Sequence, residues 1–204
     1  MGVFSSLEAQ RFYGDYDWAK KASLSEIEDS LADEGEILLL DKTVIEYDYD
    51  EDENLSEYLL EHSIRRVNSD EAIEGNNRIY LPVGATANIL KQKARVITPA
   101  GKVIELKESD IQEAEEDGQK YRYFALRGLE KGSEIEYLLL MQRALNIDGA
   151  FTILQSNIPK KKVSFEIIAP WNLAFVYKGF NGFGEMVQDT TDEETFRLIK
   201  EIDF

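Results

Sequence analysis

Short apolar runs follow one another from residue 36 to the end of the 204-residue chain, at intervals of about ten residues. Some alternate strictly, and within residues 133–141 four apolar side chains would share one face of a strand: Ile135, Tyr137, Leu139 and Met141. The last run is predicted as a strand rather than a helix, because Phe196 and Leu198 alternate with polar residues. Runs of this length and spacing predict an all-β domain over residues 36–204, an antiparallel β-sandwich.

Residues 1–35 follow a different pattern and are predicted to form an N-terminal extension. Ser23 lies three residues before Glu26, which is the spacing of a capping box, and Leu24, Ile27 and Leu31 are spaced for one helical face. Upstream, four aromatic residues are crowded into seven positions: Phe12, Tyr13, Tyr16 and Trp18. We expect a loop whose rings pack against the domain, followed by a short helix.

Two glycine-containing turns are predicted within the sandwich. In residues 96–104, Pro99 has the φ value that the second position of a type I turn requires, and Gly101 supplies a left-handed residue that realigns the returning strand. Gly132 repeats the pattern after Glu130 and Lys131. A phosphate-binding loop would instead need several glycines at the start of a helix, and neither site has that context.

The composition excludes several classes of function. The chain has 40 acidic and 23 basic residues and a net charge of −17, so it repels phosphate backbones, and no nucleic-acid partner is expected. The absence of cysteine excludes disulfides, thiolate metal sites and a cysteine nucleophile. No apolar run approaches the roughly 20 residues of a membrane span. The first residues lack the basic and apolar regions of a signal peptide.

No catalytic constellation is evident, so we expect no enzymatic activity in this chain. A serine triad would have to use His62, the single histidine, but its neighbours Glu61 and Ser63 point to the opposite face of a strand. A packed or surface histidine is the favoured interpretation. With 40 acidic residues, a pair of carboxylates at the spacing of a glycosidase arises by chance and carries no weight.

The acidic stretch 48–54 invites a calcium interpretation. Asp48, Asp50, Asp52 and Asn54 have the spacing that opens an EF-hand loop. The sixth position is Glu53 rather than glycine, however, and the twelfth is Leu59 rather than a bidentate glutamate. A solvated hairpin tip is favoured, with weak calcium binding as the alternative.

Aromatic side chains near the C-terminal third are the best candidates for ligand binding. They are Trp171, Tyr177, Phe180 and Phe183. Glycans and peptides stack on such rings, which makes a glycan- or peptide-binding site one hypothesis. Packing in the core, or docking against a neighbouring domain, is the alternative for each of them.

At these motifs the chain resembles a known bacterial family. The run A-R-x-I-T-P-x-G-K-V-I-E-L at residues 94–106 is followed by Asp110, Ile111 and Glu113, and then by G-x-E-x-G-S-x-I-E-Y at residues 128–137. This order resembles a domain of unknown function that precedes transglutaminase-like domains. The resemblance extends from about Glu36 to Gly182 and includes the segments FTILQSNIP, SFEIIAP and LAFVYKGFNG.

The resemblance implies an immunoglobulin-like β-sandwich in an exported multidomain protein, in the periplasm or at the cell surface. It implies that a C-terminal transglutaminase-like domain of the same polypeptide carries the Cys, His and Asp of a papain-type triad. The sandwich would then be a non-catalytic module that positions or supports that domain. The resemblance assigns no catalytic residue, cofactor or metal ligand to the sandwich.

Overall fold

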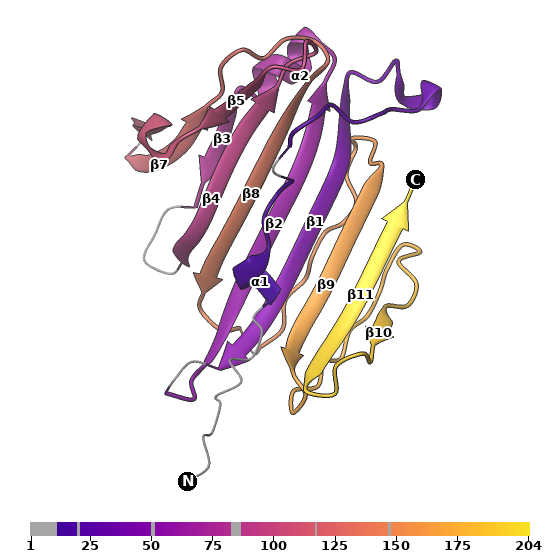
Figure 1. Ribbon diagram of the computed structural model, residues 1–204. Coiled ribbons are helices and arrows are strands. Elements are labelled where there is room, and N and C mark those ends of the chain that lie inside the picture. The colour runs from indigo at the N-terminus through magenta and orange to yellow at the C-terminus, as the bar shows by residue number, and fades with distance from the viewer. Residues whose placement is uncertain (1–11, 20, 50–51, 83–86, 117, 147) are drawn as a thin grey trace.

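The computed structural model describes residues 12–19, 21–49, 52–82, 87–116, 118–146 and 148–204 (Figure 1). Two sheets of unequal size make up the fold. The larger sheet has eight strands in the order β10-β11-β9-β1-β2-β8-β4-β5, and the smaller sheet has three in the order β3-β7-β6. Neighbouring strands are antiparallel except β1 and β9, which run parallel.

The bounds of the elements follow the chain. The strands are β1 (Glu36–Tyr49), β2 (Leu55–Val67), β3 (Arg78–Leu81), β4 (Ala87–Ile97), β5 (Val103–Leu106), β6 (Ile111–Glu116), β7 (Gln119–Ala125), β8 (Ser133–Arg143), β9 (Lys162–Pro170), β10 (Val187–Asp189) and β11 (Thr195–Asp203). The helical turns are α1 (Phe12–Asp15), η1 (Asp29–Leu31), α2 (Asp70–Gly75) and η2 (Glu108–Asp110). No helix within the described ranges is long and apolar enough to cross a membrane.

The predicted all-β class is confirmed, and so is the final strand, β11. The strand pairing does not by itself establish an immunoglobulin-like arrangement. The turn between β4 and β5 has the predicted form: Gly101 has φ 77°, and its N–H donates to the carbonyl of Thr98 at 2.8 Å. Gly132 is also left-handed, with φ 87°. Its turn leads from the small sheet into the large one, however, because β7 pairs with β3 and β6 and not with β8.

Two local predictions are wrong, and one helix was not predicted. Only the 3-10 turn η1 forms within the stretch predicted as a helix, and residues 21–28 contain no helix, because the Ser25 backbone binds the large sheet. The apolar runs at 151–156 and 173–179 are irregular rather than strands, and their side chains Leu154 and Tyr177 pack over the large sheet. Helix α2 was not predicted, although Ser69 caps it by accepting the N–H of Ala72 at 3.1 Å.

The two faces of the large sheet have different covers. One face carries the apolar cluster of Ile45, Leu59, Phe165, Met186 and Leu198, which the loops before and after β9 cover. The small sheet covers the same face at the other end, where Phe124 packs with Leu81 and Ala94. The opposite face lies under the N-terminal segment, which crosses β1 and β2 in Figure 1. We call residues 14–19 and 21–34 the N-terminal strap.

Candidate functional site

The face under the strap carries a row of charged side chains, which we call the ionic face. It comprises Lys42 from β1, His62 from β2, Arg95 from β4, Glu136 from β8, Glu166 from β9 and Arg197 from β11. Strand register explains why they share a face. Lys42 pairs with His62 and with Ser164, and Arg95 pairs with Glu136, and directly opposed residues point to the same side of a sheet.

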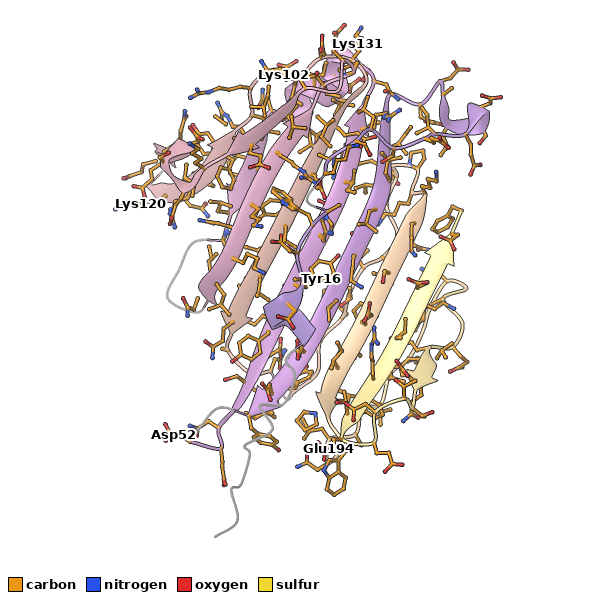
Figure 2. All side chains as sticks on the ribbon, in the orientation of Figure 1. Tyr16, Asp52, Lys102, Lys120, Lys131 and Glu194 are labelled. Carbon is orange, nitrogen blue, oxygen red and sulfur yellow. The ribbon has the colours of Figure 1, made fainter. Side chains whose placement is uncertain are left out.

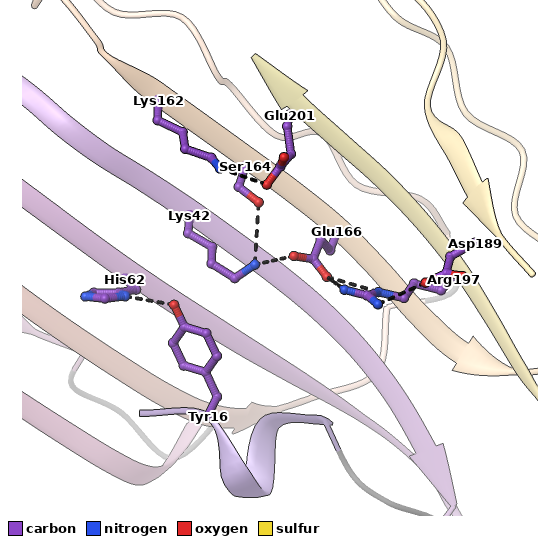
Figure 3. Close-up of polar contacts among 9 residues, drawn as sticks. All are labelled: Tyr16, Lys42, His62, Lys162, Ser164, Glu166, Asp189, Arg197 and Glu201. Atoms are coloured by element: carbon purple, nitrogen blue, oxygen red, sulfur yellow. Dashed lines mark hydrogen bonds and ion pairs between the residues drawn. The ribbon is translucent and has the colours of Figure 1, made fainter. Parts of the chain in front are cut away.

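His62 lies at the centre of a buried relay of polar groups. Its Nε2 is 2.9 Å from Oε1 of Glu136, and its Nδ1 is 2.8 Å from Oη of Tyr16. Arg95 donates from Nε to the other oxygen of Glu136 at 2.5 Å. His62, Arg95 and Glu136 are each less than a tenth exposed. Figure 3 shows Tyr16 reaching His62 from the strap.

A second set of ion pairs continues across the sheet around Glu166 (Figure 3). Lys42 donates to one oxygen of Glu166, and Nη2 of Arg197 donates to the other at 2.8 Å. Arg197 also reaches Asp189 at 3.1 Å. Burial alone would raise the pKa of Glu166, but the hydrogen bonds from Lys42 and Arg197 outweigh it and hold that pKa below its ordinary value. Glu166 is therefore a carboxylate in the folded protein at neutral pH.

The strap is held by specific contacts with this face. The Trp18 ring lies 4.3 Å from the Arg95 guanidinium carbon, in cation–π geometry. Further along, the Ser25 N–H donates to Glu134 at 2.9 Å, while Arg66 donates to the Ser25 carbonyl at 2.7 Å. Tyr16 and Trp18 also pack on a core cluster that includes Val44, Leu60 and Leu138. The expectation that the N-terminal aromatic rings pack on the domain is thus confirmed for Tyr16 and Trp18.

The order carboxylate, imidazole, hydroxyl invites comparison with a catalytic triad. A nucleophile, however, is activated by a lowered pKa or an adjacent base. Burial, reinforced by Glu166 and Glu136, raises the pKa of Tyr16 to about 12. The hydroxyl of Tyr16 is thereby held in its neutral form. Tyr16 thus lacks the lowered pKa of an activated nucleophile, and its hydrogen bond with His62 holds the strap on the sheet.

A serine–lysine arrangement is the other chemistry to weigh, because Nζ of Lys42 lies 3.5 Å from Oγ of Ser164. A lysine acts as a base only when it is neutral, whereas Lys42 is ion-paired with Glu166. Ser164 is also only 2% exposed, so a substrate does not reach its hydroxyl. No group of three or more metal-ligating acidic or histidine side chains occurs in the ranges that the structure describes.

The calcium hypothesis concerns the connection between β1 and β2. Asp48 lies in β1, and Asp52 and Asn54 lie in the link to β2, so the stretch is the tip of a hairpin as predicted. Asp50 lies outside the described residues. Weak calcium binding at this tip stays a prediction.

The structure divides the four aromatic candidates into two pairs. Trp171 and Phe180 are 72% and 67% exposed. Tyr177 and Phe183 instead pack against the apolar cluster around Met186. The Tyr177 hydroxyl donates to Glu185 at 2.6 Å and accepts the N–H of Met186 at 2.9 Å. Tyr177 and Phe183 therefore support the segment from which Phe180 projects.

Sequence reasoning missed the partners of His62. One partner, Glu136, is 74 residues away in the sequence, and the other, Tyr16, lies in the strap. Neither was predicted, because the sequence alone does not specify which strands become neighbours. One signal was present. Glu134 and Glu136 stand at alternating positions in a strand whose other members are mostly apolar, and two acids on one face of a central strand require cationic partners.

Comparison with solved structures shows where this fold occurs. It is similar to a putative protease from Parabacteroides distasonis ATCC 8503, with a TM-score of 0.60 and 12% identity, over 83% of this chain and 35% of that protein. A putative nutrient binding protein from Legionella pneumophila matches with a TM-score of 0.43 and 9% identity, over 85% of this chain and 64% of that one. The chain thus spans about a third of the length of the Parabacteroides protein.

No curated protein sequence matches the chain. A family profile does match, over residues 55–199, and its description is a domain of unknown function with a solved structure. The match includes the strands that carry His62, Arg95, Glu136, Glu166 and Arg197. It covers well over half of the chain, and the chain therefore belongs to the DUF3857 family.

Proposed function

We propose that this domain is a non-catalytic β-sandwich module of an exported bacterial protein, in the periplasm or at the cell surface. It supports a transglutaminase-like domain of the same polypeptide, whose chemistry is that of a cysteine protease. The Parabacteroides protein supports this reading, because the larger part of that putative protease lies outside the matched fold. The immunoglobulin-like character of the sandwich rests on the family resemblance and is part of the proposal.

One observation carries the proposal: large apolar side chains project from the two loops that flank β9. They are Phe151, Ile153, Trp171, Val176 and Phe180, each more than 65% exposed. Gln155 and Asn181 exchange hydrogen bonds at 3.3 and 3.5 Å, so the two loops lie side by side. Several large exposed apolar side chains on neighbouring loops support an interaction site. We name the five residues the apolar loop surface and propose that the catalytic domain docks on it.

The proposal is tested first by reading the natural coding frame beyond residue 204. It expects a region in which Cys, His and Asp follow in that order, and a stop codon directly after Phe204 would contradict it. The second test uses the protein encoded by the whole frame. Phe151→Ser with Phe180→Ser is expected to lower peptidase or transamidase activity and to separate the unfolding transitions of the two domains.

Val187→Ser is the matched control, because Val187 is 69% exposed on the edge strand β10, outside the apolar loop surface. It should leave activity and cooperativity unchanged. Equal effects of the loop variant and the control would count against docking on the loops.

The exposure of Trp171 favours a second candidate, a glycan- or peptide-binding site formed by Trp171 and Phe180. The chain has two tryptophans, so a Trp18→Phe background isolates the fluorescence of Trp171. A saccharide or peptide that binds there should shift this fluorescence and lose affinity in Phe180→Ala. A flat response across a broad panel of ligands would reject this candidate.

A further inference from the structure

Part of strand β4 is paired on one side only. β4 pairs with β8 from Ala87 to Ile97 but with β5 only from Ala94 to Ile97. Within the described residues, the stretch 87–93 therefore has an open outer edge. Along such an edge every second residue directs its backbone N–H and C=O outward, and these groups can pair with an added strand.

The open edge forms one wall of a groove of about 980 Å³. The groove is lined by residues 89–93 of β4, 113–115 of β6 and 120–122 of β7, together with Pro82 and Glu108. Side chains of a strand alternate between its faces. A groove that touches five consecutive residues of β4 therefore reaches the strand's edge and not merely one of its faces. Five residues correspond to about 16 Å of extended chain.

Two buried polar atoms in this groove lack hydrogen-bond partners within the described residues. They are Oε1 of Gln92, an acceptor, and Nε of Arg122, a donor. Arg122 Nε lies 3.5 Å from Oε1 of Glu113, an ion-pair distance without a hydrogen bond. Buried polar groups are nearly always satisfied, so both atoms point to a missing partner. A peptide group offers both complements, an N–H for Gln92 and a carbonyl for Arg122.

The charges of the groove fit a peptide better than an anion. The strap already binds two of the lysines that line the groove: Lys91 donates to the Tyr16 carbonyl at 2.7 Å, and Lys93 donates to Asp17 at 2.6 Å. The other cations of the wall, Lys120 and Arg122, lie among three carboxylates, Glu108, Glu113 and Glu115. A phosphate would meet those carboxylates at close range. An added strand would set its side chains alternately beside Lys91 and Lys93 on one face and beside Ile89 and Gln92 on the other. Polar residues suit the first set of positions, where the strap already binds both lysines, and apolar residues suit the second.

We propose that the groove between β4 and the β6–β7 hairpin binds an extended peptide of alternating polar and apolar residues, which adds to the open edge of β4 as a strand. This mode of recognition draws its affinity from main-chain hydrogen bonds and its specificity from alternate side chains. The site is separate from the apolar loop surface. Lys120 lies in the groove, and Figure 2 places it on the opposite side of the molecule from Glu194, whose carbonyl accepts the N–H of Trp171. The proposal does not depend on the proposed function.

The test uses the capped, fluorescein-labelled peptide Val-Glu-Val-Glu-Val-Glu and fluorescence anisotropy on the full chain. Saturable binding is expected. Two peptides are N-methylated at every second amide, one at the odd positions and the other at the even positions, so that the side chains are kept. One of the two should bind about tenfold or more weakly, because its methyl groups block the amides that pair with β4. Absence of saturation at about 1 mM, or equal binding by both N-methylated peptides, would overturn the proposal.

Variants locate the site. Gln92→Leu with Arg122→Met should weaken binding about tenfold, whereas Gln188→Leu on β10, at the far edge of the sheet, should leave it unchanged. Hydrogen exchange on the unaltered protein gives a readout that does not depend on variants, and the peptide should protect amides within residues 88–93. Protection at β10 instead would overturn the proposal. If the chain forms a dimer, the peptide should dissociate it. A dimer that resists the peptide but is lost in the Gln92 variant would instead assign the edge to a second copy of the chain.

Discussion

Glu136→Gln is expected to destabilise the domain far more than any surface charge change. The substitution keeps the size of the side chain and removes its charge. The Arg95 guanidinium, with a side chain only 2% exposed, then loses its carboxylate partner, and one amide oxygen and one NH2 group replace the two oxygens that contact Arg95 and His62. Buried ion pairs are costly to break because the remaining charge stays desolvated.

The magnitude follows from burial. Removing one member of a buried pair costs about 3–5 kcal/mol, against a total stability of about 5–15 kcal/mol for a domain. The Lys162–Glu201 pair provides a matched comparison at 3.1 Å, because its side chains are 40% and 53% exposed. Such exposed pairs contribute about 0–1 kcal/mol. Glu201→Gln should therefore be nearly neutral.

The assay is urea unfolding followed by far-UV circular dichroism, with the free energy of unfolding extrapolated to water. A shifted midpoint with an unchanged slope reports a loss of stability rather than a changed unfolded state. Adding Arg95→Met to Glu136→Gln removes the uncompensated charge, so the double variant should lose less than the sum of the two single losses. The reasoning is refuted if Glu136→Gln costs no more than Glu201→Gln.

Three further predictions concern titration and backbone strain. The pKa of Glu166 is lowered in the folded state, so its ion pairs stabilise the domain fully above pH 4.5, the ordinary pKa of the group. This stabilisation is lost as the pH falls through the lowered pKa. The difference in stability between the wild type and Glu166→Gln should therefore disappear in acid, and urea midpoints measured across pH test this. Desolvation, followed by repulsion from Asp41, raises the pKa of Glu61, but Glu61 is exposed and solvent screens its charge. Glu61→Gln should therefore raise the melting temperature only slightly at pH 7, and this gain should vanish below pH 4.5, where both states are protonated. Gly101→Ala should lower the stability by about 1–2 kcal/mol through left-handed backbone strain alone, since nothing lies within 4 Å of the added Cβ. Gly75→Ala in α2 is the control, because its Cβ also enters open space but its φ is not positive. It should be neutral or stabilising in the same thermal melts.

The sequence pattern predicted features that depend on neighbouring residues, namely strands and turns. Alternation located most of the strands, and the Pro99–Gly101 turn has the expected conformation because its φ angles depend on the residues themselves. Sheet order is decided by contacts between distant segments. The parallel pairing of β1 with β9 joins residues more than a hundred positions apart, and no neighbouring residue specifies it. The exposure of Trp171 and the packing of Tyr177 depend on the same long-range arrangement.

The absent helix near Ser23 illustrates how tertiary contacts override propensity. Ser25 would need its N–H and carbonyl within a helix, but the N–H binds Glu134 and the carbonyl binds Arg66. Arg66 and Glu134 are themselves paired at 2.5 Å in a buried setting. A short, marginal helix gains too little from its own hydrogen bonds to compete with charged partners already fixed by the sheet.

The strap also determines which surfaces are left for partners. The buried charges disfavour other packings of this face. Any group that replaces the strap must supply the contacts that Ser25 makes with Glu134 and that Trp18 makes with Arg95, which is itself paired with Glu136. The ionic face is therefore occupied by the chain itself and is unavailable to a ligand while the strap is in place. The two surfaces proposed for partners, the apolar loop surface and the open edge of β4, both lie outside the ionic face. Because they lie on different parts of the domain, the two proposals are compatible with each other.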